Sequence, residues 1–305
     1  MLIAEPRLFT KDHYEAHKGV APAHLCELVV HCLELAAQLA QRGLDFRFKG
    51  GNSQLILLDQ PERFSIDVDV VTTMGKPELS AAVEELAAAC DVFTRCEVRP
   101  HKTKPWLPMI SFKLFFDSVY QAPEDAYVML DAVLEPPPYP GIRRPVRCGD
   151  LYVSEVEVEV PSLGGLVADK LLCIGPSTLG IPLGKKKEGQ RLKHVFDVAL
   201  LSVYPHDHDL TRNSLGAIIE QENRIQKSEW TRDQVFADTR EFCGLPLQHD
   251  DRPDDSLLEP GTYLDEIARG FDDFRHHPFR AEYTWPRLRD DCRKILALLD
   301  ELERG

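Results

Sequence analysis

The chain has 305 residues, of which 43% are hydrophobic and 28% are charged, a composition typical of a soluble globular protein with one large or two ordinary domains. Its net charge of −14 argues against a positively charged coat for nonspecific nucleic-acid binding, but it is compatible with a local basic groove. The eight cysteines form no C-x-x-C pair, so we expect reduced thiols in a cytoplasmic protein without a structural zinc site. No apolar run approaches the roughly 20 residues that span a membrane.

An amphipathic helix is expected first, because apolar residues recur at helical spacing between Pro22 and Arg42, before Gly43 ends the pattern. The stretch from Phe46 to Val71 then predicts a short strand, a Gly-Gly turn, a short helix and a second strand. Further along, alternation and helical spacing predict a helix over 76–90 and strands over 93–98, 109–116 and 126–134, with residues 148–160 forming either one more strand or a linker.

The pattern changes after Pro161, where helical spacing replaces alternation. The expected helices, the first of them capped by Ser162, cover 162–173, 191–203, 211–226, 230–242 and 286–304, while 246–260 has the composition of an exposed loop. We therefore expect an α+β fold. A mixed β-sheet with flanking helices and an N-terminal helix would form an α/β core over 1–160, and a mostly helical domain over 161–305 would complete the active-site cleft.

Three carboxylates stand at strand positions that packing does not explain. Asp67 and Asp69 are two residues apart, so both side chains lie on one face of the predicted strand. Asp131 interrupts the apolar run VMLDAVL, where an unpaired buried charge is costly; the plainer alternative is a strand-end residue paired with an arginine. Together the three could hold two Mg²⁺ ions, or Mn²⁺ in their place, that clamp the attacking and leaving oxygens in phosphoryl transfer. Asp131 is also the candidate base for an attacking hydroxyl.

A phosphate site is predicted beside these carboxylates. Gly50 and Gly51 follow a strand and precede a helix, where free backbone N–H groups and the helix dipole favour an anion. Ser53 fits the same site. Lys170, on the first helix of the second half, is predicted to contact a bound triphosphate as a point charge.

Three further candidates each have a plainer alternative. Asp197 either orients Lys170 or a substrate group in the active site, or it pairs with Lys193 one helical turn earlier. Arg63 and Arg191 are candidate phosphate contacts; otherwise they are charges of a loop and of a helix surface.

Two short runs of charged residues carry weaker signals. The basic run 185–187 either touches an RNA backbone or forms an exposed loop. The run His206–Asp209 has the residue types of a metal site, but its position beside Pro205 favours a loop in which Asp209 caps the next helix.

The order of these motifs resembles the nucleotidyltransferase superfamily with its polymerase-beta-like fold. GGNS at 50–53 followed by RFSIDVD at 63–69 is similar to its first motif, and the form Arg-x-Ser-x-Asp-x-Asp resembles the AbiEii/AbiGii toxin branch of type IV toxin–antitoxin systems. Asp131 resembles the second motif, VADKL at 167–171 the third, and RLKHVFD at 191–197 the fourth.

The resemblance implies an NTP-dependent enzyme that transfers an NMP to an acceptor hydroxyl and releases pyrophosphate. It also implies tRNA as the acceptor in some members and a cognate antitoxin as a partner. Asn52 departs from the family pattern, in which a small hydroxyl residue is usual, and His194 stands where Asp is frequent. Two other functions fit the same residues: a nucleotide-binding protein that binds a partner without catalysis, and an enzyme that modifies a small molecule or a protein hydroxyl.

Overall fold

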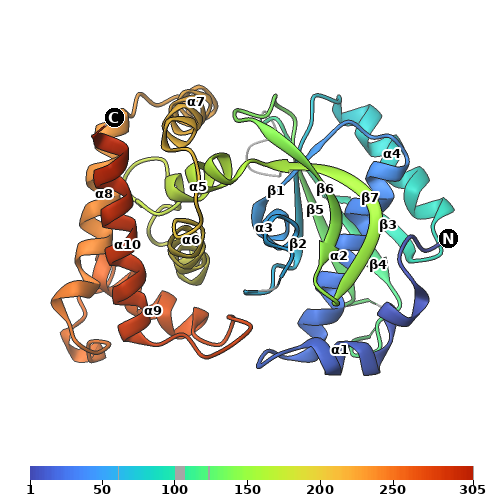
Figure 1. Cartoon of the computed structure of the whole chain (residues 1–305), viewed down its shortest axis with the longest axis horizontal. Coiled ribbons are helices and arrows are strands. Elements are labelled where there is room, and N and C mark those ends of the chain that lie inside the picture. The colour runs from blue at the N-terminus through green and yellow to red at the C-terminus, as the bar shows by residue number, and fades with distance from the viewer. Residues whose placement is uncertain (61, 100–106, 123, 305) are drawn as a thin grey trace. The chain divides into compact units, whose positions relative to one another are not determined.

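The computed structural model describes residues 1–60, 62–99, 107–122 and 124–304. Their contacts divide the chain into two compact units, and Figure 1 labels the elements of both. The first unit comprises Met1–Pro137 and Gly141–Pro161, and the second comprises Pro138–Pro140 and Ser162–Gly305.

A mixed sheet forms the centre of the first unit. Its seven strands, within the described residues, lie in the order β3-β4-β5-β2-β1-β7-β6. They are β1 (Arg47–Lys49), β2 (Asp67–Val71), β3 (Phe93–Arg99), β4 (Met109–Phe116), β5 (Tyr127–Val133), β6 (Gly141–Cys148) and β7 (Tyr152–Pro161). Strand β2 runs parallel to β5, β1 runs parallel to β7, and the other neighbours are antiparallel. The expected α+β fold with a mixed sheet is confirmed.

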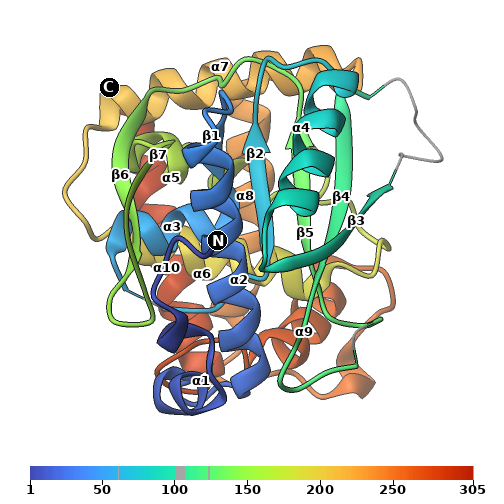
Figure 2. The ribbon, with the colours of Figure 1, turned by 90° about the vertical axis from the view of Figure 1, so that its right-hand side faces the viewer.

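The two faces of this sheet differ because successive side chains of a strand point to opposite sides. In β5, Val128, Leu130 and Ala132 are fully buried, whereas Asp131 between them is half-buried on the other face. Helices α2 (Ala23–Gln41) and α4 (Lys76–Ala89) cover the apolar face and lie in front of the sheet in Figure 2. The opposite face therefore carries the polar side chains.

Helix α2 is long and apolar enough to cross a membrane by length and composition, so the expectation that no run approaches this length is wrong. Yet 83% of its apolar window is buried inside the protein. Its Glu34 is fully buried and accepts hydrogen bonds from the backbone N–H groups of Ile3 and Ala4 and from the Tyr152 hydroxyl. These contacts identify α2 as the core helix of the first unit.

Strand β6 was not predicted, and only β7 corresponds to the strand or linker expected after residue 148. Pro145 lies within β6, and the pairing with β7 is irregular between Pro145 and Arg147. Because β6 is an edge strand, it tolerates a residue that has no N–H to donate. The other helical elements that the structure describes in the first unit are η1 (Pro6–Phe9), α1 (Lys11–His17) and α3 (Gly50–Leu58).

The second unit is helical. Its helices are α5 (Leu163–Leu172), α6 (Glu188–Leu201), α7 (His208–Gln226), α8 (Arg232–Gly244), η2 (Pro246–Gln248), η3 (Asp255–Leu257), α9 (Tyr263–Phe274) and α10 (Trp285–Glu303). Ser162 caps α5 as predicted, since its side chain accepts a hydrogen bond from the Gly165 N–H. The predicted cap of α7 was wrong by two residues, because Asp207 caps this helix and Asp209 lies in its first turn.

Helix α9 was not predicted. Ile267, Phe271 and Phe274 are buried at helical spacing, but a glycine and several carboxylates weaken the pattern. Gly270 is needed there because a Cβ would lie 2.6 Å from the Glu188 carbonyl oxygen of α6.

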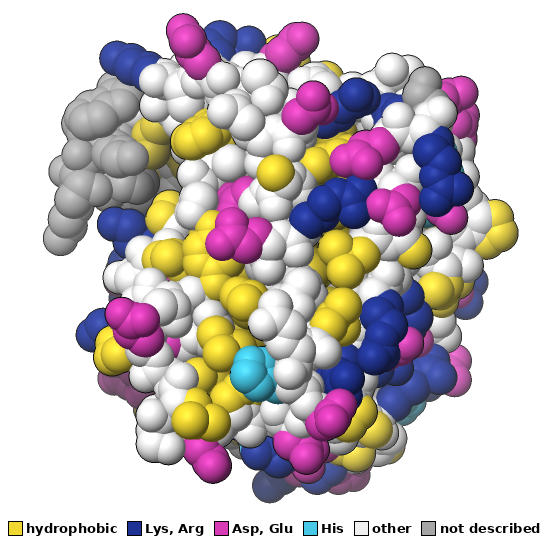
Figure 3. Space-filling view, turned by 90° about the vertical axis from the view of Figure 1, so that its left-hand side faces the viewer, with side chains coloured by type: hydrophobic (Ala, Val, Ile, Leu, Met, Phe, Trp, Pro, Cys, Tyr) yellow, Lys and Arg dark blue, Asp and Glu magenta, His cyan; other side chains and the backbone are white. Residues whose placement is uncertain are grey.

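On the face drawn in Figure 3, Lys and Arg side chains are interspersed with Asp and Glu, as expected for a charged but mixed surface.

Candidate active site

The three predicted metal-binding carboxylates lie on one face of the first unit's sheet. Asp69 of β2 is paired with Asp131 of β5, and Asp67 is paired with Met129. Paired residues of neighbouring strands point to the same face, with the strands about 4.8 Å apart. All three carboxylates are half-buried, on the face opposite α2. Like charges this close repel one another, so the arrangement favours a bound cation.

The start of α3 lies directly against Asp69. Gly50 is the first residue of α3, with φ +71°, and a Cβ at this position would lie 2.0 Å from Asp69 Oδ2. Both the left-handed backbone and the close approach require glycine. The Ser53 hydroxyl donates a hydrogen bond of 2.9 Å to the Gly50 carbonyl. The predicted Gly-Gly turn is therefore the first turn of a helix, whose free N–H groups begin beside the carboxylates.

Gly51 is enclosed by polar residues from the loop before β2. A Cβ on Gly51 would lie 2.4 Å from Ser65 Oγ and 3.1 Å from Arg63 Nη2. Arg63 is buried and donates a hydrogen bond of 3.1 Å to the Phe64 carbonyl. Its positive charge is therefore fixed beside the start of α3. Ser65 was not among the predicted site residues, although its place in the Arg-x-Ser-x-Asp-x-Asp run could have indicated it.

Asn52, which departs from the family pattern, joins α3 to β2. Its side-chain amide is buried and donates a hydrogen bond of 2.7 Å to the Asp67 carbonyl. Behind it lies Cys32 of α2, where burial and the nearby Asp67 charge raise the pKa of the thiol, a hydrogen bond with Asn52 opposes the rise, and Asp69 adds to it. Cys32 therefore stays protonated and packs behind the carboxylates.

Asp131 is bonded to a serine of the neighbouring strand. Ser111 of β4 is paired with Asp131, and its Oγ donates a short hydrogen bond to Asp131 Oδ1. The bond fixes the orientation of the Asp131 carboxylate through one of its oxygens. Sequence reasoning missed Ser111. The alternation of MISFKLFF, in which this serine shares a face with Lys113, was the available signal.

Within the described residues, no three His, Cys, Asp or Glu side chains converge into a preformed metal site. The donor set of Asp67, Asp69 and Asp131 is nevertheless all oxygen, which suits a hard divalent cation. Proteins usually hold Mg²⁺ through one or two carboxylates together with water and substrate phosphates, without a complete protein cage. The three carboxylates therefore fit a cation that binds together with a nucleotide.

In the second unit, the predicted residues Lys170 and Asp197 contact each other. Lys170 Nζ of α5 donates a hydrogen bond of 2.6 Å to Asp197 Oδ2 of α6. The two side chains are only 2% and 0% exposed. Of the two partners considered for Asp197, the structure places Lys170 in contact with it.

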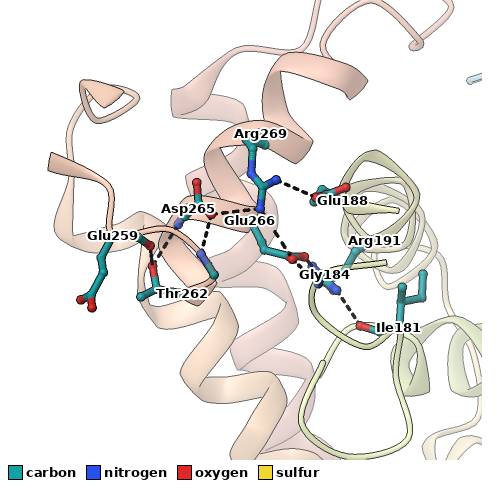
Figure 4. A network of polar contacts seen from close by, with 10 residues as sticks. Ile181, Gly184, Glu188, Arg191, Glu259, Thr262, Asp265, Glu266 and Arg269 are labelled. Carbon is teal, nitrogen blue, oxygen red and sulfur yellow. Dashed lines mark hydrogen bonds and ion pairs between the residues drawn. The ribbon is translucent and has the colours of Figure 1, made fainter. Parts of the chain in front are cut away.

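Arg191 lies inside the second unit, in the polar network of Figure 4. Its Nη1 contacts Glu266 of α9 at 2.9 Å, and its Nη2 donates to the Ile181 carbonyl. Arg269 joins the same network through Glu188 at 3.1 Å and Glu266 at 3.7 Å. The network ties the unpredicted helix α9 to α6, and it gives Arg191 a role in holding the helical unit together. The basic run 185–187 is exposed in the loop before α6.

A model of the family described as nucleotidyl transferase AbiEii toxin, type IV TA system, matches residues 34–301. The chain belongs to this family. It is therefore a nucleotidyltransferase of a toxin family, and the system implies an NTP substrate and a cognate antitoxin. The predicted resemblance to this branch and the predicted enzyme class are confirmed.

Among solved structures, the AbiEii-family chain is similar to MenT4, a nucleotidyltransferase toxin from Mycobacterium tuberculosis H37Rv. The two are 14% identical with a TM-score of 0.53, over 96% of this chain and 99% of MenT4. At this identity the likeness supports the fold. A search of curated proteins finds no significant match.

Proposed function

We propose that this AbiEii-family enzyme is a cytoplasmic, Mg²⁺-dependent toxin that transfers an NMP from an NTP to an acceptor hydroxyl, with tRNA as the acceptor. The supporting observation is the pairing of Asp69 with Asp131 on one sheet face, next to the glycine that opens α3. Family membership supports the reaction class. The cognate antitoxin implied by the family would bind the toxin.

Each candidate site residue of the first unit has a role in the proposed reaction. The N–H groups of Gly50 and Gly51 bind the triphosphate at the start of α3. Asp67, Asp69 and Asp131 would hold the divalent cation, which would supply positive charge against the phosphate oxygens. Ser53 fixes the first turn of α3 through the Gly50 carbonyl, and the Arg63 guanidinium beside Gly51 favours the anion.

The chemical step is a displacement at the α-phosphorus. The acceptor oxygen forms a bond to this phosphorus while the bond to the pyrophosphate oxygen breaks, so the electron pair leaves with pyrophosphate. The acceptor proton passes to Asp131, whose carboxylate Ser111 holds in place through Oδ1. The predicted contact of Lys170 with the triphosphate, the predicted role of Arg191 at a phosphate and the predicted role of the helical domain in the cleft stay predictions.

The test is a transfer assay with each α-labelled NTP, Mg²⁺ and a cell lysate, followed by separation of RNA, protein and small molecules. We expect label in the RNA fraction, mainly in tRNA, and its loss in Asp67→Asn and Asp69→Asn or after chelation of the metal. The matched control is Asp45→Asn, which changes an exposed carboxylate before β1. Wild-type transfer by both site variants would refute the mechanism. Nucleotide binding by calorimetry without pyrophosphate release would instead support a noncatalytic binding protein.

A further inference from the structure

We propose that β3 and β4 carry a phosphate-binding surface for the backbone of an RNA acceptor. We call it the acceptor strip, and it consists of Arg95, Arg99 and Lys113. The proposal rests on the proposed function, because it assigns the acceptor to the same carboxylates. It adds the place where the acceptor lies and the residues that hold it.

The acceptor strip shares its sheet face with the carboxylates. Arg99 is paired with Ser111, which is paired in turn with Asp131, and Asp131 with Asp69. Side chains in one such row point to the same face. Since neighbouring strands lie about 4.8 Å apart, Arg99 on β3 lies on the order of 10 Å from Asp131 on β5. The next row places Lys113 beside Met129.

Each cation of the acceptor strip is held by a neighbouring side chain. Lys113 Nζ lies 3.8 Å from the centre of the Tyr127 ring, and the Arg95 guanidinium lies 3.5 Å from that of Phe115. Arg99 Nη1 reaches across β4 to the Met129 sulfur at 4.0 Å. The two rings order these cations through cation–π contacts and are themselves covered. The strip is therefore suited to phosphates, which carry no sequence information, and less to stacked bases.

The reaction geometry places the acceptor on the side of β2 where β5, β4 and β3 lie. In phosphoryl transfer the attacking and leaving oxygens are roughly in line across the phosphorus. The leaving pyrophosphate is assigned to the start of α3, which follows β1 on one side of β2. The attacking hydroxyl must then approach from the opposite side, where β5, β4 and β3 follow in order. Phosphates that precede a terminal hydroxyl would consequently lie over the acceptor strip.

The local charge also favours a polyanion. Over β3 and β4, the described residues of this face include three cations and one carboxylate, Glu97, which contacts Arg95 at 2.6 Å and is paired with Lys113. The carboxylates Asp67, Asp69 and Asp131 of the same face lie on β2 and β5. The Arg95 and Glu97 side chains are 48% and 50% exposed, and exposed pairs of this kind are weak, about 0–1 kcal/mol. A phosphate can therefore compete for Arg95. This local excess of positive charge contrasts with the net charge of −14 of the whole chain.

The test compares Arg99→Ala, Lys113→Ala and the double variant in transfer from labelled NTP to purified total RNA. We expect the KM for RNA to rise roughly threefold to tenfold per cation removed, and its dependence on log salt to weaken by about 0.7 for each contact with a single strand. The KM for NTP should stay unchanged. Arg99→Lys should restore most of the RNA affinity. Arg143→Ala, which removes an exposed arginine of β6 in the same sheet, is the matched control.

The outcomes separate this proposal from the proposed function. If the double variant keeps the wild-type KM for RNA and salt dependence while Asp69→Asn abolishes transfer, the acceptor strip is wrong and the reaction stands. Label carried by a protein hydroxyl would also overturn the strip. If Asp69→Asn transfers normally, the proposed function fails. Thermal unfolding of each variant checks that the sheet is intact, so that a change in KM reports binding.

Discussion

The predicted carboxylates of the two units lie in different environments. In the sheet unit, Asp67, Asp69 and Asp131 are half-buried and share one face. In the helical unit, Lys170 and Asp197 are almost fully buried and contact each other. A buried pair with good geometry holds elements together, whereas like charges that gather on an accessible face disfavour the folded state unless a ligand compensates them. The same residue types therefore form a buried ion pair in one unit and the proposed cation site in the other.

The largest expected effect concerns the buried ion pair of the helical unit. Asp197→Ala leaves the Lys170 ammonium buried without this carboxylate, so we expect a loss of about 3–5 kcal/mol in the free energy of unfolding. Replacing both residues by apolar ones should recover much of the loss. Denaturant unfolding measures both changes. The control is Asp255→Ala, since this carboxylate is 83% exposed in its pair with Arg252, and it should cost under about 1 kcal/mol. A similar small cost for Asp197→Ala would contradict the structural role.

Asp69→Asn should have the reverse profile. Removing one charge from the carboxylate face relieves repulsion, so we expect unfolding free energy equal to or above that of the wild type. Transfer activity should fall on the order of 10²–10³-fold, because a group that stabilises developing charge is lost. A transfer assay and a thermal melt on the same protein sample measure the pair of effects. A destabilised variant with intact activity would contradict the proposed role of the carboxylate face.

Sequence patterns predicted the site of the sheet unit better than that of the helical unit, for a physical reason. Asp67 and Asp69 are fixed by strand alternation alone, and an Asp within VMLDAVL contradicts its local pattern, so the sequence itself marks it. The partner of Arg191 could not be predicted in this way, because Glu266 lies on α9, a helix that the sequence pattern did not predict. Ser111 was missed for a different reason: its strand was predicted, but its contact with Asp131 depends on the register of β4 against β5.

Gly50→Ala tests the close contact between the start of α3 and Asp69 in the sheet unit. Left-handed backbone costs alanine about 1–2 kcal/mol, and the added Cβ would lie 2.0 Å from Asp69 Oδ2. We expect a stability loss above that strain together with a large loss of NTP binding. Gly43→Ala is a matched control, since Gly43 has φ +75° but nothing within 4 Å of its Cβ position. Equal unfolding free energies for the two variants would show that the contact with Asp69 contributes nothing.

The smallest effect concerns the apolar side of the same sheet, where a titratable side chain of α2 is buried. His31 of α2 stacks on Phe116 with ring centres 3.8 Å apart, and its Nδ1 donates to the Glu27 carbonyl in the neutral form. Burial lowers the pKa of His31 to about 4. Between this value and the unfolded pKa of about 6.5, the unfolded chain binds the extra proton, so stability falls as the pH falls.

Relative to His31→Gln, the wild type should therefore lose about 1 kcal/mol of unfolding free energy between pH 6 and pH 5. The raised pKa of Glu27, which burial causes, has the opposite effect on stability but is common to both proteins and cancels in the difference. Denaturant unfolding at pH 7, 6 and 5 measures it. Parallel pH curves would mean that His31 is solvated in the folded protein. In that case solvent would stabilise the His31 imidazolium, and the folded protein would bind the proton as readily as the unfolded chain does.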